Sequence, residues 1–336
     1  MTRELKRRGL SLGKAEYTKL LLALIFVGMV FIPLMQMFSN MDMDSIKRVV
    51  NAHDFGDVVA HSLISALLGT VITVALAFAL AMCVERSRIP CKGLFSIIFV
   101  LPMLIPSISH GMGLVILLGN NGILTKLLGL DGGVIYGLSG IVTGSVLYTF
   151  PVAYLMLADV IHYEDGSAYE AARVLGIPKR RQLTAITLPF LKKPLISVVF
   201  AVFTLIITDY GVPLMVGGTY KTVAKVMYED VIGGLDFGKG AAYGTILLVP
   251  AVIAFVVDIM NKDRGNSGYV TKPCELSKNK VANTCALVFC VLVALLILLP
   301  LVSFGTLAFA TNYPNDLTFT LANLQKTFRL RAGAYY

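Results

Sequence analysis

Runs of about 20 apolar residues recur along this chain, and they constrain its fold more than any other feature. A helix of that length crosses the hydrocarbon core of a bilayer, which is about 30 Å thick. Charged residues make up only 15% of the chain, whereas soluble domains usually carry about a quarter. We therefore predict an all-α membrane protein, a polytopic helical bundle with about seven transmembrane helices, near residues 20–38, 58–84, 94–118, 138–161, 194–216, 241–260 and 282–310.

The distribution of lysine and arginine predicts the orientation of this bundle, because cytoplasmic loops carry an excess of basic residues. With the N-terminus inside the cell, 20 basic residues fall in the inner segments 1–19, 85–93, 162–193 and 261–281. Only 9 fall in the outer segments 39–57, 119–137, 217–240 and 311–336. We therefore predict a multi-pass protein of the lipid bilayer with a cytoplasmic N-terminus. The net charge of +9 then reflects membrane topology, and we expect no nucleic-acid partner.

The residue types that carry catalysis or bind metals form no recognisable set in this sequence. No pair of carboxylates, Ser-His-Asp set or His/Cys ligand cluster stands out, and the five cysteines include no CxxC pair. We therefore expect no enzyme activity, no catalytic residue, no cofactor and no bound metal.

Two ionisable residues lie inside predicted spans, where such residues are functional candidates. His110 lies in the segment LPMLIPSISHGMG, whose prolines and glycines interrupt the helical pattern. Asp209 lies about 15 residues into the fifth predicted span, within TDYGVP. Interrupted helices are tolerated where they line a water-filled cavity, so both residues are candidates for lining a path. The alternatives are ordinary kinked helices, structural hydrogen bonding by His110, and helix breaking or capping by Asp209 beside Gly211.

One polar stretch, YEAARVLGIPKRRQLTAITLPF, lies between two apolar runs. Ser167 and Glu170 form an S-x-x-E capping box, which predicts a helix start. Gly176 suits the left-handed turn that ends this helix, and Pro178 suits the first turn of a second helix that we expect Pro189 to stop. A structured hairpin on the predicted cytoplasmic face is suited to docking a partner. The alternative is a hairpin that packs only against its own bundle.

The same stretch contains the pattern E-A-A-x3-G-x9-I-x-L-P, complete at every position: Glu170, Ala171, Ala172, Gly176, Ile186, Leu188 and Pro189. It resembles the EAA loop of the membrane (permease) subunits of binding-protein-dependent ABC importers, and the resemblance covers about residues 58–260. It implies a type I ABC importer transmembrane-domain fold in the bacterial cytoplasmic (inner) membrane. It also implies ABC ATPase subunits that couple to these seven residues and to Leu175, an extracytoplasmic solute-binding protein, and a second permease unit.

Within the matched region, LPMLIPS and ITDYGVPLMVGG resemble the branch of this family that imports ferric iron or organophosphonates such as 2-aminoethylphosphonate. Members of that branch often carry two six-helix units, and the first helix with its polar tail recurs weakly near the end of this chain. We predict four parts: a basic segment, first helix and outer loop at 1–57, a permease domain at 58–260 with its EAA loop at 162–193, a cytoplasmic linker at 261–281, and the first helix of an incomplete second unit at 282–336.

Two other classes of protein stay open at this point. A secondary transporter would need coupling-ion sites near the middle of the membrane. Only His110 and its neighbours could supply them, and the EAA loop would go unexplained. A truncated, non-transporting fragment would bind partners and move nothing.

Overall fold

The computed structural model describes residues 14–129, 132–261, 272–312 and 316–333. Seven helices in these ranges are long and apolar enough to cross a membrane, which confirms the predicted number. These spans are formed by α1 (Lys14–Ser39), α3 (Phe55–Arg86), α5 with α6 (Ser107–Leu118 and Ile123–Leu128), α7 (Leu138–His162), a π-helical turn with α10 (Leu183–Thr187 and Leu188–Ile207), α13 (Phe237–Asn261) and α14 (Lys280–Thr306).

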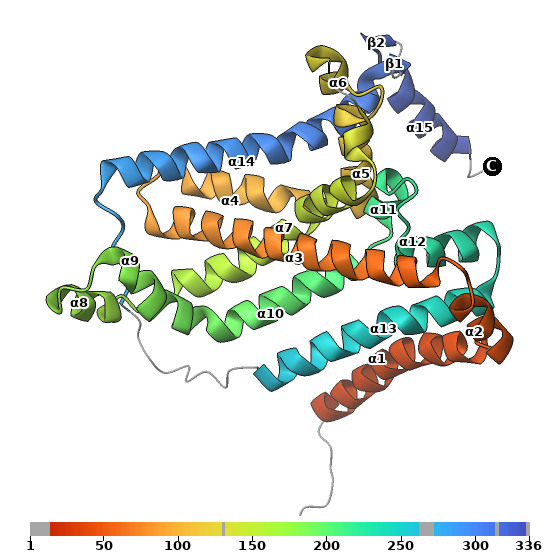
Figure 1. The fold of residues 1–336 in the computed structure, drawn as a ribbon, viewed down its shortest axis with the longest axis horizontal. Coiled ribbons are helices and arrows are strands. Elements are labelled where there is room, and N and C mark those ends of the chain that lie inside the picture. Colours follow the sequence, from red (N-terminus) through yellow and green to blue (C-terminus); the bar gives the residue numbers. More distant parts are fainter. Residues whose placement is uncertain (1–13, 130–131, 262–271, 313–315, 334–336) are drawn as a thin grey trace, which may run out of the picture.

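The short elements gather mainly at two ends of the bundle (Figure 1). One end carries α8 (Ser167–Val174) and α9 (Lys179–Gln182). The opposite end carries α2 (Met43–Val50), α11 (Gly211–Val216), α12 (Val223–Tyr228), a π turn (Glu229–Gly233), the antiparallel hairpin of β1 (Ala310–Asn312) and β2 (Asp316–Phe319), and α15 (Ala322–Gly333). Three 3₁₀ turns lie at Leu101–Leu104, Gly132–Ile135 and Leu307–Phe309, and α4 (Lys92–Val100) lies beside α14.

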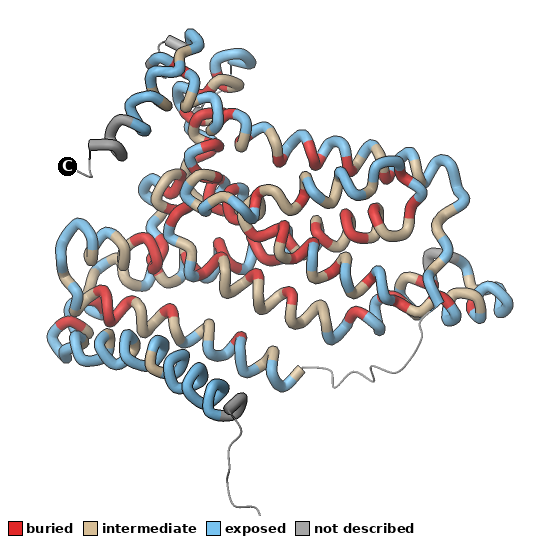
Figure 2. Tube along the Cα trace, turned by 180° about the vertical axis from the view of Figure 1, so that it is seen from behind, coloured by how far each residue is buried: buried red, intermediate tan, exposed pale blue. Residues whose placement is uncertain are grey.

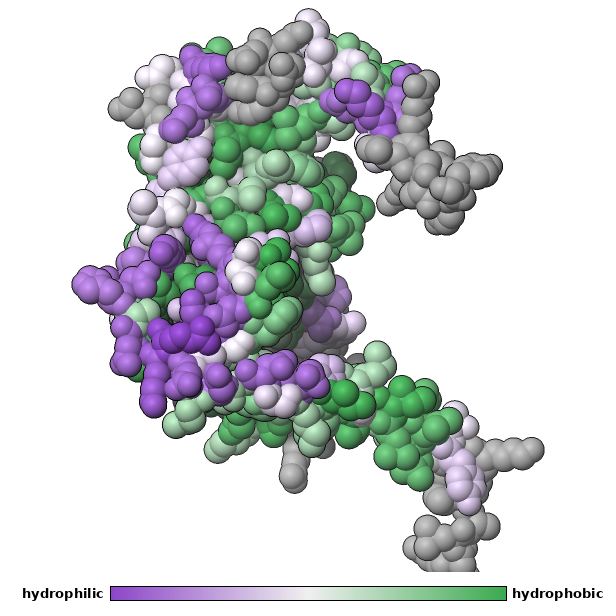
Figure 3. Space-filling view, turned by 90° about the vertical axis from the view of Figure 1, so that its right-hand side faces the viewer, coloured by the Kyte–Doolittle hydropathy of each residue, from purple (hydrophilic) through white to green (hydrophobic). Residues whose placement is uncertain are grey.

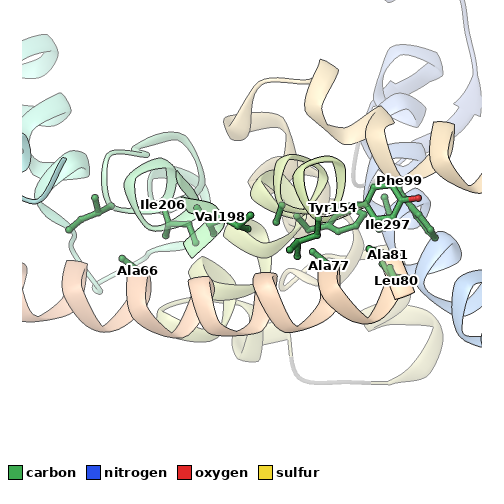
Figure 4. Packing of buried hydrophobic residues seen from close by; sticks show 14 of the residues in the cluster. Ala66, Ala77, Leu80, Ala81, Phe99, Tyr154, Val198, Ile206 and Ile297 are labelled. Carbon is green, nitrogen blue, oxygen red and sulfur yellow. The ribbon is translucent and has the colours of Figure 1, made fainter. Parts of the chain in front are cut away.

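The core forms where small residues let α3 approach its neighbours closely. Figure 4 shows alanines of α3 beside larger side chains from α4, α7, α10 and α14; its labels mark Ala66, Ala77, Ala81, Phe99, Tyr154, Val198, Ile206 and Ile297. The hydroxyl oxygens of Thr73 on α3 and Thr149 on α7 lie 3.2 Å apart, which adds an interhelical hydrogen bond. In a membrane, such close packing and hydrogen bonding hold helices together, because lipid is as apolar as the helix surface.

The first and last spans along the chain pack very differently. α14 lies against α3, α4 and α5. A Cβ on Gly113 of α5 would lie only 2.4 Å from the carbonyl oxygen of Pro300 on α14, so these helices touch backbone to backbone. α1 buries none of its membrane span, and Figure 2 shows it exposed along its length. The division between a unit at 58–260 and a second unit from 282 stays a prediction, and α14 packs against the first of these.

The third predicted span, at 94–118, is interrupted, as its prolines and glycines indicate, but its bounds are wrong, because the membrane-length helical stretch covers Ser107–Leu128. The chain forms α4, a 3₁₀ turn and then α5 over this region. Pro102 lies in the first positions of the 3₁₀ turn and Pro106 is the N-cap of α5. A proline lacks the N–H that a continuing helix needs, so the two prolines divide the run into pieces.

The fifth predicted span, at 194–216, is shifted. The helical stretch begins earlier, at Leu183, and ends at Ile207. The predicted boundary placed Lys192 in the cytoplasmic segment 162–193. A lysine near a helix end can lie along apolar surface with its aliphatic stem while the ammonium group reaches water, so it does not end the span.

The end that carries α2 and α12 is rich in charged side chains, and Figure 3 shows hydrophilic residues gathered over it. An ion pair joins Arg48 of α2 to Asp236, with 3.1 Å between nitrogen and oxygen. Another joins Lys221 to Asp54 at 3.1 Å. These pairs tie loops that are far apart in sequence, and they give this end of the bundle a polar surface suited to water.

Candidate functional site

The segment between α7 and α10 contains α8 and α9 and carries the predicted EAA loop. The predicted capping box is wrong in its partners: the N-cap of α8 is Gly166, and Ser167 is the first helical residue. The amide of Ser167 donates to the Asp165 carboxylate at 3.0 Å, and the Ser167 hydroxyl donates to it as well. Because Asp165 satisfies the first orphan donor, Glu170 does not cap the helix. Its carboxylate pairs instead with the Lys272 ammonium at 2.7 Å.

The predicted left-handed turn at Gly176 is present, with a φ of +68°. The Gly176 amide donates to the Arg173 carbonyl at 3.0 Å and the Ile177 amide donates to the Ala172 carbonyl at 2.9 Å. This pair of bonds is the Schellman arrangement, which satisfies the last carbonyls of a helix. The chain then turns sharply into α9, whose N-cap is Pro178.

The residues of the EAA pattern do not share one surface of α8. Ala172 is 3% exposed and packs inward on the bundle, whereas Ala171 and Gly176 are exposed. Leu175 is 75% exposed, and the neighbouring Val174, which is not part of the EAA pattern, is 89% exposed. The outer edge of α8 therefore ends in two adjacent apolar side chains that the described residues leave uncovered.

The second half of the pattern lies in a continuous helix, so the predicted stop at Pro189 is wrong. Ile186 lies in the π turn, and Leu188 and Pro189 form the first positions of α10. The Leu188 amide donates to the carbonyl of Leu183, five residues earlier, instead of four. This wider turn places Pro189 next to a change of hydrogen-bond register, where its missing N–H does not break the helix.

A buried polar cluster anchors the EAA loop to the bundle. Glu164, which is 2% exposed, forms an ion pair with Arg86 at the end of α3. Tyr169 of α8 donates to Glu164 at 2.7 Å, its oxygen lies 2.6 Å from the Thr187 hydroxyl, and the Arg86 guanidinium lies 5.2 Å from the centre of its ring. Burial and the Glu164 carboxylate raise the pKa of Tyr169 to about 12, so its phenol keeps the donated proton.

The sequence motifs did not predict this cluster, because Arg86, Glu164 and Thr187 come from separate segments and none of them belongs to the EAA pattern. Arg86 ends one span and Glu164 follows another, and both ends belong to the same predicted face of the membrane. The available signal for the cluster was the pair of opposite charges, Arg86 and Glu164, at the same predicted depth in the membrane. A cavity of about 400 Å³ lies beside the cluster, lined by Arg86, Tyr169, Arg173 and residues 274–278 among others.

The two path candidates lie near the contact between α5 and α11. His110 is 1% exposed; its Nδ1 lies 3.2 Å from the Pro106 carbonyl and its ring meets Tyr148 edge-on at 6.1 Å. Among the described residues its Nε2 has no hydrogen-bond partner. Asp209 lies beyond the end of α10 and accepts hydrogen bonds from the amides of Gly211 and Val212, at 3.3 and 3.0 Å. Its carboxylate thus binds the first two amides of α11, whose N-cap is Tyr210, and it lies after the end of the span at Ile207 instead of the predicted 15 residues into one.

His110 lies in α5 and Asp209 precedes α11, and these two helices pack tightly against each other. A Cβ on Gly211 would lie 2.4 Å from the hydroxyl oxygen of Ser107 on α5, and one on Gly111 would lie 2.7 Å from Cβ of Met215 on α11. Within the part of the chain that the structure describes, no group of three or more His, Cys, Asp or Glu side chains could hold a metal ion.

The family model described as "Binding-protein-dependent transport system inner membrane component" matches residues 72–262, more than half of the chain. The chain belongs to this family. It is a multi-pass inner-membrane component of the permease type, and the matched region contains α8, α9 and the buried cluster around Glu164. The residues of the EAA pattern also lie within the matched region.

Two kinds of named permease are similar to this family member. The ferric transport system permease protein FbpB of Actinobacillus pleuropneumoniae is 26% identical over 300 residues, which cover 85% of this chain and 43% of that protein. The spermidine/putrescine transport system permease protein PotC homolog of Mycoplasma genitalium is 24% identical over 77% of this chain and 94% of that protein. The chain therefore spans less than half the length of the ferric transport relative.

A solved structure shows the same fold. The chain superposes on a permease chain of a bacterial ABC transporter involved in the import of the acidic polysaccharide alginate, with a TM-score of 0.62 and 15% identity. The match covers 73% of this chain and 94% of that one. At this identity the likeness establishes the fold, which is that of an ABC importer permease.

Proposed function

We propose that this permease forms part of the solute path of an ATP-driven importer, and that ABC ATPase subunits dock on the α8 end. The observation that carries the proposal is the apolar edge of α8. Val174 and Leu175 are 89% and 75% exposed on a helix whose other side is fixed by Ala172 and Tyr169. An exposed apolar side chain on a rigid support is suited to fill a pocket on a partner, where a few such residues supply most of the binding energy.

This proposal places the α8 end and the N-terminus in the cytoplasm. The excess of lysine and arginine in the segments at that end supports the orientation. The extracytoplasmic solute-binding protein then meets the polar end that carries α2 and α12. ATP hydrolysis belongs to the partner chains, and this chain converts their closure into movement of the bundle.

The path itself requires a second permease unit. His110 and Asp209 are the candidates in this chain for lining it, because Nε2 of His110 has no hydrogen-bond partner among the described residues and Asp209 lies beyond the end of α10. The second unit would complete the path from the other side. No chemistry on the solute is needed, since the solute only has to be bound and released on opposite sides.

The docking step is tested by comparing Leu175→Asp with Leu127→Asp. Both leucines are 75% exposed, but Leu127 lies on α6 at the opposite end of the bundle. We expect ATPase subunits to co-purify in mild detergent with the native chain and with Leu127→Asp, and to be lost with Leu175→Asp. A native chain that carries no ATPase under any condition would overturn the proposal and favour the non-transporting fragment.

The proposed solute is ferric iron, because the ferric transport permeases are similar over most of this chain. The test is uptake of radiolabelled ferric iron and, in parallel, of 2-aminoethylphosphonate by cells with and without the gene. Uptake of iron that stops on ATP depletion and survives collapse of the ion gradients supports the proposal. Uptake that follows an ion gradient would favour a secondary transporter, and uptake of the phosphonate alone would replace the solute.

A further inference from the structure

The segment Lys272–Ser277, which we call the strap, crosses the start of the EAA loop. The Gly166 amide donates to the Lys272 carbonyl at 2.7 Å, and the Lys272 amide donates to the Asp165 carboxylate at 3.2 Å. At the other end of the strap, the Ser277 amide donates to the Arg86 carbonyl at 2.9 Å. A segment without regular secondary structure is thus joined by main-chain hydrogen bonds to both α8 and α3.

The strap fits against the loop because residue 166 is a glycine and carries no side chain. A Cβ on Gly166 would lie 2.9 Å from the Pro273 carbonyl oxygen, 3.0 Å from the Lys272 carbonyl oxygen and 3.2 Å from Cα of Cys274. The Cys274 thiol donates to the Glu164 carbonyl at 3.3 Å. The strap therefore lies directly on the N-cap of α8, with its thiol turned toward the buried cluster.

Two ion pairs fix the strap along α8. The Lys272 ammonium pairs with Glu170 at 2.7 Å, and the Arg173 guanidinium pairs with Glu275 at 2.8 Å. Glu170 raises the pKa of Lys272, and Arg173 lowers the pKa of Glu275, as expected for contacts that favour the charged forms. Exposed pairs of this kind contribute little to stability, but two of them at successive turns set the register of one segment against the other.

The strap leads directly into α14 and is fixed to its first turn. Asn279 caps α14 through the amides of Val281 and Ala282. The Asn283 side chain donates to the Ser277 carbonyl at 3.1 Å and accepts from the Arg88 amide at 3.2 Å. α14 then packs along α5, which carries His110. The strap therefore connects the EAA loop to α14, a membrane helix that lies far from the loop along the chain.

We infer that the strap is a positioning element of the EAA loop, which makes α8 and the first turn of α14 move as one body. This inference rests on the proposed coupling to ATPase subunits. A displacement of α8 would reach α10 through the contact of Tyr169 with Thr187, in the π turn that leads into α10, and it would reach α14 through the strap, so the two membrane helices on either side of the core would shift together.

The first experiment asks whether the strap stays attached during transport. Arg173→Cys and Glu275→Cys are introduced together after the five native cysteines are replaced by serine, and a disulfide is formed in native membranes. We expect cross-linking in most molecules, and iron uptake by the cross-linked protein within about two-fold of the cysteine-free protein that keeps Arg173 and Glu275. Absence of the cross-link, or uptake that stops on cross-linking and returns with dithiothreitol, would overturn the inference.

The second experiment asks whether the attachment matters. Arg173→Glu and Glu275→Arg, each alone, should lower the solute imported per ATP hydrolysed several-fold, and the double exchange should restore it. Lys278→Glu is the control, because this cation lies in the same region, 3.9 Å from Glu275, but pairs with no residue of α8. Single variants with native coupling, or a double exchange that restores nothing, would contradict the inference.

Co-purified ATPase is measured in every sample, which separates two kinds of failure. A native chain with which no ATPase subunit co-purifies refutes the proposed function. The cross-link still shows in that case whether the strap lies on α8. Retained ATPase with unchanged coupling in the single variants refutes the strap alone.

Discussion

Glu164 is the residue on which the anchoring of the EAA loop depends most. Its carboxylate serves two partners from different elements, Arg86 of α3 and Tyr169 of α8. A buried carboxylate is tolerated only when its charge is paired and its oxygens are hydrogen-bonded, and here both conditions hold. The cluster fixes the direction in which α8 leaves the bundle.

Removing the Glu164 carboxylate leaves Arg86 with an uncompensated charge in a mostly buried position. Loss of one partner of a buried pair typically costs about 3–5 kcal/mol, so we expect Glu164→Ala to lower the thermal unfolding midpoint of the purified chain markedly. Glu85→Ala is the control, because its partner His162 is 63% exposed and such surface pairs contribute about 0–1 kcal/mol. Equal losses in the two variants would contradict the anchoring role of Glu164.

Gly176 allows a second prediction at this scale. A left-handed backbone costs a residue with a Cβ about 1–2 kcal/mol, so Gly176→Ala should lose stability in that range. Gly129 is a matched control: its φ is +62°, and at both glycines a Cβ would meet nothing within 4 Å. We expect similar stability losses, measured by thermal unfolding. Only Gly176→Ala should also weaken ATPase co-purification, and an equal effect of Gly129→Ala would argue against a specific role for this turn.

At the scale of single elements, local sequence patterns predicted the features that depend on hydrogen bonds between neighbouring residues. The turn at Gly176 was predictable because the residues that form it are neighbours. The capping box was not, because Asp165 and Lys272 compete for its donors and acceptors, and Lys272 lies 102 residues from Glu170. The sequence did not predict the helix through Pro189, because that helix depends on a π turn. The turn changes the hydrogen-bond partner of the Leu188 amide, and the spacing of side chains does not indicate such a change.

The contacts between the strap and α8 should change only at strongly acidic or strongly basic pH. Hydrogen bonds from Ser167 lower the pKa of Asp165, and Arg173 lowers the pKa of Glu275. The stability that these two carboxylates contribute is therefore fully present above their usual pKa values of about 3.9 and 4.3, and it is lost as the pH falls through their lowered pKa values. Glu170 raises the pKa of Lys272, so its contribution is complete below about 10.4 and lost above the raised value.

The measurement is hydrogen exchange at the Gly166 amide, corrected for the intrinsic rate at each pH. We expect constant protection from about pH 5 to 9 and loss of protection in acid below about pH 4. A loss near pH 6 to 7 would show that a group other than these carboxylates holds the strap.

For the whole molecule, the number of spans and the fold class were predictable because the bilayer demands about 20 apolar residues per crossing. The arrangement of the spans was not predictable in this way. α1 and α14 are both long, apolar and interrupted by one proline, Pro33 and Pro300. Yet α14 lies against three helices of the core and α1 buries none of its span, because the difference depends on complementary surfaces such as that of Gly113.

The packing of α14 is tested at Gly113. A Cβ there would lie 2.4 Å from the Pro300 carbonyl, so Gly113→Ala must separate α5 from α14, and overpacking of this kind costs about 1–3 kcal/mol. Gly28→Ala in α1 is the control, because its nearest contact would be 3.8 Å away, at Ile32 of the same helix. We expect thermal unfolding in detergent to report a loss for the first variant and none for the second.

The position of α14 also has a consequence for biosynthesis. Helices leave the ribosome in order, so α3, α4 and α5 enter the membrane long before the segment that covers them has been translated. Their shared surface must stay in contact with lipid or with insertion machinery until about residue 309 has emerged. A nascent chain of which only residues 1–279 have left the ribosome would therefore contain every residue of the family match and still be an unfinished bundle.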